Sequence, residues 1–158
     1  MNSEDQLSDN LNDILSFQEI KTQDLFDLNY VLSNSNSNSK LFIAHFNIRG
    51  LNANFERLES FLASLKHKPQ IIICTETRIL EFANFFNLDG YTAYYNESKI
   101  NICDGVIVFV LDSIEHTSAI NIIEPMKIIK VSLKINNLHL NISALYRSHD
   151  LKKLILII

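Results

Sequence analysis

The sequence has little cysteine, proline and glycine, no tryptophan and no long apolar run. Its two cysteines, Cys74 and Cys103, are too few for a disulfide framework or a four-cysteine zinc site. No stretch reaches the ~18 consecutive apolar residues of a membrane-spanning helix. The first residues are Met-Asn-Ser-Glu-Asp, whereas a signal peptide starts with positive charge. These absences predict an intracellular protein, nuclear or cytoplasmic, with no membrane partner.

Acidic side chains are concentrated near the N-terminus. Residues 1–40 hold seven acids and two lysines, a balance of -5, whereas residues 41–158 hold 11 acids and 12 bases, a balance of +1. The chain therefore lacks the basic stripe that drives non-specific nucleic-acid binding. Any nucleic-acid role must depend on a local site.

The chain divides into an extension, a linker and a body. Leucine and isoleucine recur at helical spacing over about 4–19, which predicts an amphipathic helix within an acidic extension, 1–32. Residues 33–40 consist mainly of alternating Ser and Asn, a composition typical of a flexible linker. The body, 41–158, is expected to form one domain.

A strand, a helix and a second strand are predicted at the start of the body. The apolar segment 41–48 indicates a largely buried strand, and the β-branched segment 70–75 indicates another. Asn54 is a candidate helix cap between them. The helix is predicted from apolar residues at intervals of three and four, namely Phe55, Leu58, Leu62 and Leu65. This βαβ pattern predicts two parallel neighbouring strands.

The remaining segments are typical of strands joined by polar turns. Predicted strands are 91–95, 105–110, 128–135 and 138–145. The last two alternate apolar and polar residues around Asn136 and Asn137, which can adopt a positive φ and close a hairpin. Residues 151–158 follow with no closing element expected.

Two polar residues come at the ends of the first two predicted strands, Asn47 and Glu76. If these strands are parallel neighbours, their carboxyl ends meet at the edge where α/β sheets place ligands. A carboxylate and an amide oxygen suit Mg²⁺, which binds one or two carboxylates together with water and phosphate oxygens. Alternatively, Asn47 caps the following turn and Glu76 pairs with Arg78 at the surface.

Tyr146 and Arg147 form a third candidate at the end of the hairpin strand. A phenol and a guanidinium there could bind a phosphate together, because arginine presents a planar fork to its oxygens. The alternative is an edge aromatic beside a solvated arginine.

The motifs together resemble an endonuclease/exonuclease/phosphatase domain, and most closely the apurinic-type endonuclease of non-LTR (LINE-type) retrotransposons. This resemblance is carried by segments in the family's order: 45–51, 69–78, 90–91, 104–110 and 144–147. It implies an α/β fold, here a partial four-layer α/β sandwich of that type, and a metal-dependent DNA phosphodiesterase.

The resemblance also implies roles for single residues. Asn47 matches the family's first-strand Asn, which orients metal and phosphate, and Glu76 matches its Mg²⁺-binding Glu. Tyr146 matches the active-site Tyr that contacts the scissile phosphate. Arg147 and Arg78 are the candidate phosphate or DNA contacts.

The chain also departs from the family. Asp104 replaces a usual Gly, and Ser148 and His149 replace prolines. Neither the Gly-Asp-Phe-Asn-like motif nor the C-terminal Ser-Asp-His of the family follows Tyr146. We therefore expect a truncated domain that is inactive alone and binds Mg²⁺ weakly.

The truncation also leads to an expectation about packing. The chain is expected to supply about one sheet of the sandwich, with inner-face residues such as Ile72, Val108 and Ile142 left partly uncovered. An uncovered sheet of this kind would favour self-association.

Two other functions agree with the same sequence. One is the N-terminal part of an active Mg²⁺-dependent hydrolase of the same superfamily that acts on a phosphate ester. The other is a non-catalytic interaction module that uses the predicted helix at 4–19 or an open sheet edge.

Overall fold

The described part of the chain forms one helix and two four-stranded sheets. The computed structural model describes residues 41–79, 86–96, 105–123, 126–135, 138–146 and 155–157. Its elements are β1 (Ile43–Asn47), α3 (Leu51–Ser64), β2 (Ile71–Thr75), β3 (Tyr91–Asn96), β4 (Val106–Leu111), β5 (Glu115–Ile123), β6 (Met126–Ile135), β7 (Leu138–Tyr146) and β8 (Ile155–Ile157). The predicted mixed α/β class is confirmed. The predicted extension, 1–32, and linker, 33–40, lie outside the described residues.

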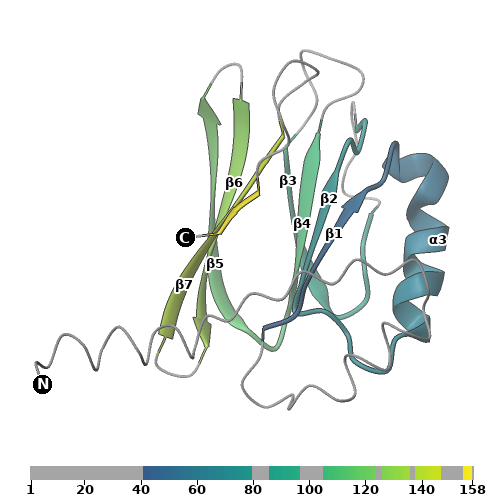
Figure 1. The fold of residues 1–158 in the computed structure, drawn as a ribbon, viewed down its shortest axis with the longest axis horizontal. Coiled ribbons are helices and arrows are strands. Elements are labelled where there is room, and N and C mark those ends of the chain that lie inside the picture. The colour runs from purple at the N-terminus through teal and green to yellow at the C-terminus, as the bar shows by residue number, and fades with distance from the viewer. Residues whose placement is uncertain are drawn as a thin grey trace, which may run out of the picture.

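The two sheets and the helix are arranged in layers. Sheet A has the strand order β1-β2-β4-β3, and sheet B has the order β5-β6-β7-β8. Figure 1 shows α3 on one side of sheet A and sheet B on the other. The described residues thus supply two sheets, so the prediction of about one sheet is wrong.

The predicted βαβ unit is confirmed, with one correction to its first strand. β1 and β2 pair in parallel, and Asn47 lies opposite Thr75 in the register. All five residues of β2 are buried, as expected for a central strand rich in β-branched side chains. β1 is only partly buried and His45 is exposed, because within the described residues β1 lies at the edge of sheet A.

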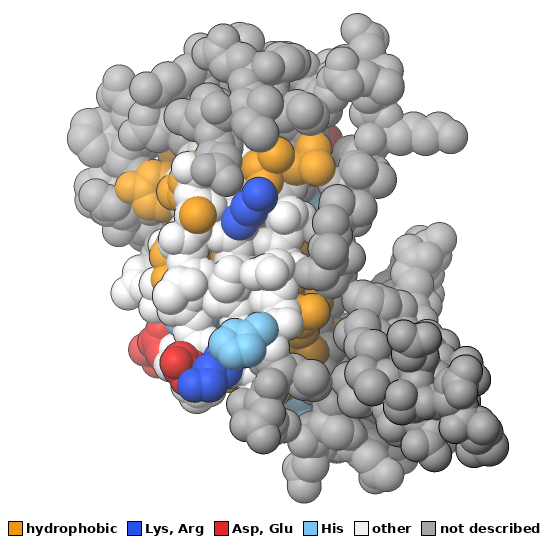
Figure 2. Space-filling view, turned by 90° about the vertical axis from the view of Figure 1, so that its left-hand side faces the viewer, with side chains coloured by type: hydrophobic (Ala, Val, Ile, Leu, Met, Phe, Trp, Pro, Cys, Tyr) orange, Lys and Arg blue, Asp and Glu red, His pale blue; other side chains and the backbone are white. Residues whose placement is uncertain are grey.

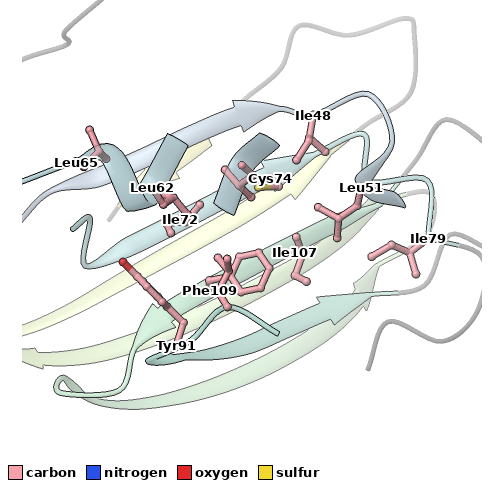
Figure 3. Close-up of a cluster of buried hydrophobic side chains, with 12 residues drawn as sticks. Ile48, Leu51, Leu62, Leu65, Ile72, Cys74, Ile79, Tyr91, Ile107 and Phe109 are labelled. Carbon is pink, nitrogen blue, oxygen red and sulfur yellow. The ribbon is translucent and has the colours of Figure 1, made fainter. Parts of the chain in front are cut away.

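Helix α3 covers one face of sheet A through an apolar stripe. Leu58, Leu62 and Leu65 are buried against that face, as their spacing predicts, and Figure 3 shows Leu62 and Leu65 above the sheet side chains. The predicted cap is wrong: the N-cap is Gly50, and Asn54 lies in the first turn. The amide of Asn54 instead donates to the carbonyl oxygens of Ile48, at 2.9 Å, and Gly50, at 3.1 Å.

The other face of sheet A packs against sheet B. Val108 of β4 and Ile142 of β7 belong to one buried cluster between the sheets, whereas Ile72 of β2 belongs to the cluster under α3. All three side chains have an exposed fraction of 0%. The expectation that they would lack cover is therefore wrong, because α3 and sheet B each cover one face of sheet A. Self-association stays a prediction, but the uncovered sheet face from which it was argued is not present in the described residues.

Sheet B contains the predicted hairpin and two strands that were not predicted as such. β6 and β7 pair antiparallel with Ile135 opposite Leu138, so the hairpin is confirmed. β5 pairs with β6, and β8 pairs with β7 through residues 155–157, although no closing element was expected there. In Figure 2 the outward face of this sheet is largely white, the colour of uncharged polar side chains and backbone. No helix in the described ranges has the length and apolarity required to cross a bilayer.

Candidate functional site

Asn47 and Glu76 are in direct contact at the carboxyl ends of β1 and β2. The side-chain nitrogen Nδ2 of Asn47 donates a hydrogen bond to Oε1 of Glu76 at 2.8 Å. Both residues are half-buried. Parallel pairing of the two strands places their ends together, so the predicted proximity of these side chains is a property of the fold.

Backbone hydrogen bonds join the two turns that follow these strands. The amide nitrogens of Ile48, Gly50 and Leu51 donate in turn to the carbonyl oxygens of residues 75, 76 and 77, at 3.0, 2.8 and 2.8 Å. Glu76 has a φ of +57°, in the left-handed region that non-glycine residues rarely adopt. Such a conformation persists only where its surroundings hold it, so this ladder fixes the backbone that carries the Glu76 carboxylate.

Asn47 belongs to a row of side chains that crosses the end of sheet A. The register places Asn47 opposite Thr75, Thr75 opposite Val106, and Val106 opposite Asn96. Val106 belongs to the cluster between the sheets, so the row faces sheet B. Three of its four members are polar. His45 joins the row through its Nε2, which lies 3.1 Å from the Thr75 hydroxyl.

Three buried polar atoms near this end have no hydrogen-bond partner. They are Oδ1 of Asn47, Oγ1 of Thr77 and Nδ2 of Asn96. A buried polar atom without a partner costs about 1–3 kcal/mol, and native structures pair the large majority of them. Among the described residues, all three atoms belong to side chains at the end of sheet A where β1 and β2 finish.

The turn after β2 packs tightly against the start of β4. The Thr77 nitrogen donates to the Gly105 carbonyl oxygen at 3.3 Å. A Cβ atom on residue 105 would collide with the Thr77 hydroxyl, and Gly105 has a φ of +113°. Glycine is therefore required here both by its backbone conformation and by the close approach of the turn.

Strand direction brings the end of β7 to the same end of the sandwich. β4 runs antiparallel to β2, residues 112–114 connect β4 to β5, and strand direction then alternates through β6 and β7. The strands of both sheets run along a common direction in Figure 1. Tyr146 ends β7, so its backbone lies at the end where β1 and β2 finish.

Of the two arginines predicted as phosphate contacts, only Arg78 lies among the described residues. Arg78 is exposed and follows Thr77 in the turn, with a φ of +55°. Arg49 is also exposed, lies in the adjoining turn and has a φ of +50°. Arg147 and the side chain of Tyr146 lie outside the described residues.

The donor set of this site suits a hard cation better than a soft one. Within the described ranges, no group of three or more His, Cys, Asp or Glu side chains is placed to hold a metal ion. Glu76 instead offers one carboxylate, beside the partnerless amide oxygen of Asn47. One carboxylate supplemented by neutral oxygens fits Mg²⁺, which retains water and binds phosphate oxygens.

The sequence did not predict that Thr77, Asn96 and His45 would lie at the end of sheet A beside Asn47 and Glu76. Asn96 is the last residue of a strand, as Asn47 is, and this shared position was the signal that could have identified it. Thr77 has no comparable signal, because its burial depends on contact with Gly105.

No family model matches this chain, and neither does any curated protein. Support for a function therefore comes from the geometry of this site and from the motifs that form it.

Proposed function

We propose that residues 41–158 are part of a four-layer α/β sandwich of the endonuclease/exonuclease/phosphatase type. In this proposal they carry the metal-binding side of a Mg²⁺-dependent DNA endonuclease of retrotransposon origin. The observation that carries it is the 2.8 Å hydrogen bond between Asn47 and Glu76, at the joined carboxyl ends of two parallel strands. The motifs that resemble the family contribute both residues.

Asn47 and Glu76 would hold the cation together. The Glu76 carboxylate supplies negative charge, and Oδ1 of Asn47, which lacks a partner, supplies a neutral oxygen. The hydrogen bond from Asn47 orients the carboxylate and leaves Oδ1 available. When bound, Mg²⁺ polarises a phosphodiester and offsets the negative charge that develops on its oxygens.

The remaining residues of the proposed site would bind the phosphate. Tyr146, at the end of β7, would donate its phenolic hydrogen to a phosphate oxygen. Arg147 and Arg78 would bind phosphodiester oxygens, because guanidinium groups form strong charge-assisted hydrogen bonds with them. In this proposal DNA is the partner, and it binds at the end of the sandwich where β1, β2 and β7 finish.

The 158 residues alone are expected to cleave DNA at close to the background rate. They contain neither the Asp-x-Asn nor the Ser-Asp-His motif that completes the family's site after Tyr146. A missing general base costs ~10²–10⁴-fold, and each missing charge-stabilising donor about another 10²–10³-fold. Supercoiled plasmid incubated with the chain and Mg²⁺ should stay intact. Nicking that disappears in Glu76→Ala would overturn this expectation.

Metal binding tests the site directly. Titration with Mg²⁺, followed by amide NMR, should shift signals from residues 47–50 and 75–78 in the wild type but not in Glu76→Gln. The side-chain oxygen of the introduced glutamine can still accept the bond from Asn47, so the fold should be retained. Glu59→Gln is the matched control, because it removes the same charge from an exposed position on α3. Equal Mg²⁺ binding by wild type and Glu76→Gln would refute the proposed site.

A further inference from the structure

Strand β5 forms the longest sheet edge among the described residues. Sheet A ends in β1 and β3, and sheet B ends in β5 and β8. β5 has nine residues, whereas β1, β3 and β8 have five, six and three. Residues 117–120 of β5 are all exposed, whereas β1 has one exposed residue and β3 has none. The outer edge of β5 is therefore the longest row of backbone groups that another strand can approach.

β5 also lacks the features by which edge strands usually avoid pairing with another chain. Such strands are commonly protected by lysine, by proline or by a bulge. β5 contains no lysine, arginine or proline, and only its first residue, Glu115, carries a formal charge. It pairs with β6 at nine consecutive positions without a bulge. The edge beyond Glu115 is thus regular and uncharged, so a second β5 strand that pairs there meets no like charge.

Ile120 provides an apolar contact on this edge. It lies opposite Ile129, which is buried between the sheets, so Ile120 is on the face of β5 directed toward sheet A. It is nevertheless 47% exposed, and among the described residues it is the one large apolar side chain that is exposed. The ring of His116, on the same face, packs edge-on against Tyr94 of β3 with ring centroids 5.7 Å apart. β3 therefore covers this face near the start of β5 and leaves it open at Ile120.

We infer that β5 is a dimerisation edge, at which two copies of the chain pair their β5 strands antiparallel about a twofold axis at Ile120. Such an interface uses the same surface on both copies. Ile120 lies opposite its own copy, with the two Cβ atoms about 4.5–5.5 Å apart, so each side chain covers the other. One strand pair is small beside the roughly 1,200–2,000 Å² that stable interfaces bury, so the dimer is a weak one.

This interface is separate from the proposed metal site. β5 finishes beside the start of β6 and the end of β7, at the end of the sandwich where β1 and β2 also finish. Antiparallel pairing of β5 places the two copies in opposite directions, so the two pairs of Asn47 and Glu76 lie at opposite ends of the dimer. Dimerisation covers neither pair and requires no metal.

Sedimentation velocity of the full chain tests the inference. The average mass should rise from monomer toward dimer between about 10 and 500 μM. Ile120→Lys brings two positive charges together at the axis, so it should weaken dimerisation by about tenfold or more. Ser132→Lys is the matched control, because it adds the same charge at an exposed position on β6, a strand inside the sheet. A wild-type chain that stays monomeric, or Ile120→Lys that dimerises as the wild type does, overturns the inference.

Cross-linking tests the register of the two strands. Ile120→Cys is made together with Cys103→Ser, and Cys74 is buried. Mild oxidation should link two copies, because the two introduced thiols lie directly opposite each other. Thr117→Cys is the matched control, because Thr117 is exposed on the same strand but lies about 20 Å from its copy in this register. Failure of Ile120→Cys to link, or equal linking through Thr117→Cys, overturns the proposed pairing.

Glu76→Gln keeps this inference apart from the proposed function. The variant should dimerise as the wild type does, because Glu76 lies away from β5. If the chain dimerises through β5 while no form of it binds Mg²⁺, the edge stands and the proposed metal site fails. If Mg²⁺ binds through Glu76 to a chain that stays monomeric, the metal site stands and the dimerisation edge fails.

Discussion

The hydroxyl of Thr77 lies in the space that a Cβ atom on residue 105 would have to occupy. This contact joins the turn that carries Glu76 to the start of β4, since the Thr77 nitrogen also donates to the Gly105 carbonyl oxygen. The absence of a side chain at residue 105 thus allows the turn after β2 to lie close against sheet A. The geometry of the proposed site depends on that close approach.

Gly105→Ala should destabilise the fold by about 2–6 kcal/mol. The new methyl group meets the Thr77 hydroxyl, and alanine must adopt a φ of +113°; overpacking and a left-handed backbone each cost about 1–3 kcal/mol. Urea unfolding measures the loss. Gly90→Ala is the matched control, because Gly90 has a φ of +81° but no atom within 4 Å of its Cβ position, so it should lose only about 1 kcal/mol.

A double mutant separates the steric part of this cost. Thr77→Ala removes the colliding oxygen, so Gly105→Ala should cost less in a Thr77→Ala background than in the wild type. An equal cost in both backgrounds would show that the collision contributes nothing.

The parts of the fold that could be predicted are those with a local pattern. β2 is a continuous β-branched run, and β6 and β7 alternate apolar and polar residues, so both patterns were sufficient. β5 was missed because its residues before Asn121 are exposed except for the half-buried His116, and no alternation marks them. The start of α3 was misplaced because backbone bonds to the turn after β2, rather than a capping side chain, fix it.

The candidate site, like the fold, could be predicted only where a local sequence pattern specifies it. The contact between Asn47 and Glu76 followed from parallel pairing, which the strand–helix–strand pattern predicts. The row that ends in Asn96 could not be predicted, because it depends on β4 pairing between β2 and β3. Neither the spacing of residues nor a motif specifies that strand order.

The packing between the two sheets should contribute strongly to stability. Ile129→Ala removes buried methylene and methyl groups from the cluster between the sheets, where Ile129 is 0% exposed, so it should cost about 2–5 kcal/mol. Ile120 on β5 is 47% exposed, and Ile120→Ala should change the stability by less than about 0.5 kcal/mol. Chemical denaturation of both variants measures the difference. A comparable loss in the two variants would contradict the packing of sheet B on sheet A.

The proposed role of Arg78 in DNA binding predicts a change in salt dependence. Arg78→Gln should weaken DNA binding and lower the slope of log affinity against log salt concentration by about one, as expected when one phosphate contact is lost. Fluorescence anisotropy at several salt concentrations measures both quantities. Arg57→Gln is the matched control, because Arg57 is exposed on α3 and should leave the slope unchanged. If the Arg78→Gln slope equals that of the wild type, Arg78 does not contact a phosphate.

The stability of the fold should decrease above about pH 9, because two buried groups are held in their neutral forms. Burial raises the pKa of the Cys74 thiol from 9.0 to about 12. Burial also raises the pKa of Tyr91 from 10.0 to about 12, and the Tyr91 hydroxyl donates to the Pro69 carbonyl oxygen at 2.7 Å. In the unfolded chain each group loses its proton at its ordinary pKa, so rising pH favours unfolding. The stabilisation is complete below about pH 9 and is lost as pH rises toward about 12.

The Cys74 thiol has the lower ordinary pKa of the two groups, so its contribution to the pH dependence of stability can be measured separately. Between about pH 9 and 10 the unfolded thiol ionises before the tyrosine does, and its slope approaches about 1.4 kcal/mol per pH unit. Urea denaturation of Cys74→Ala should show a flatter pH dependence in that interval, whatever its stability at neutral pH. Tyr91→Phe should keep nearly the wild-type slope close to pH 9 and become clearly flatter only from about pH 10 upward. A Cys74→Ala slope equal to that of the wild type would mean that the thiol ionises as easily in the folded chain as in the unfolded one, which contradicts its burial in β2.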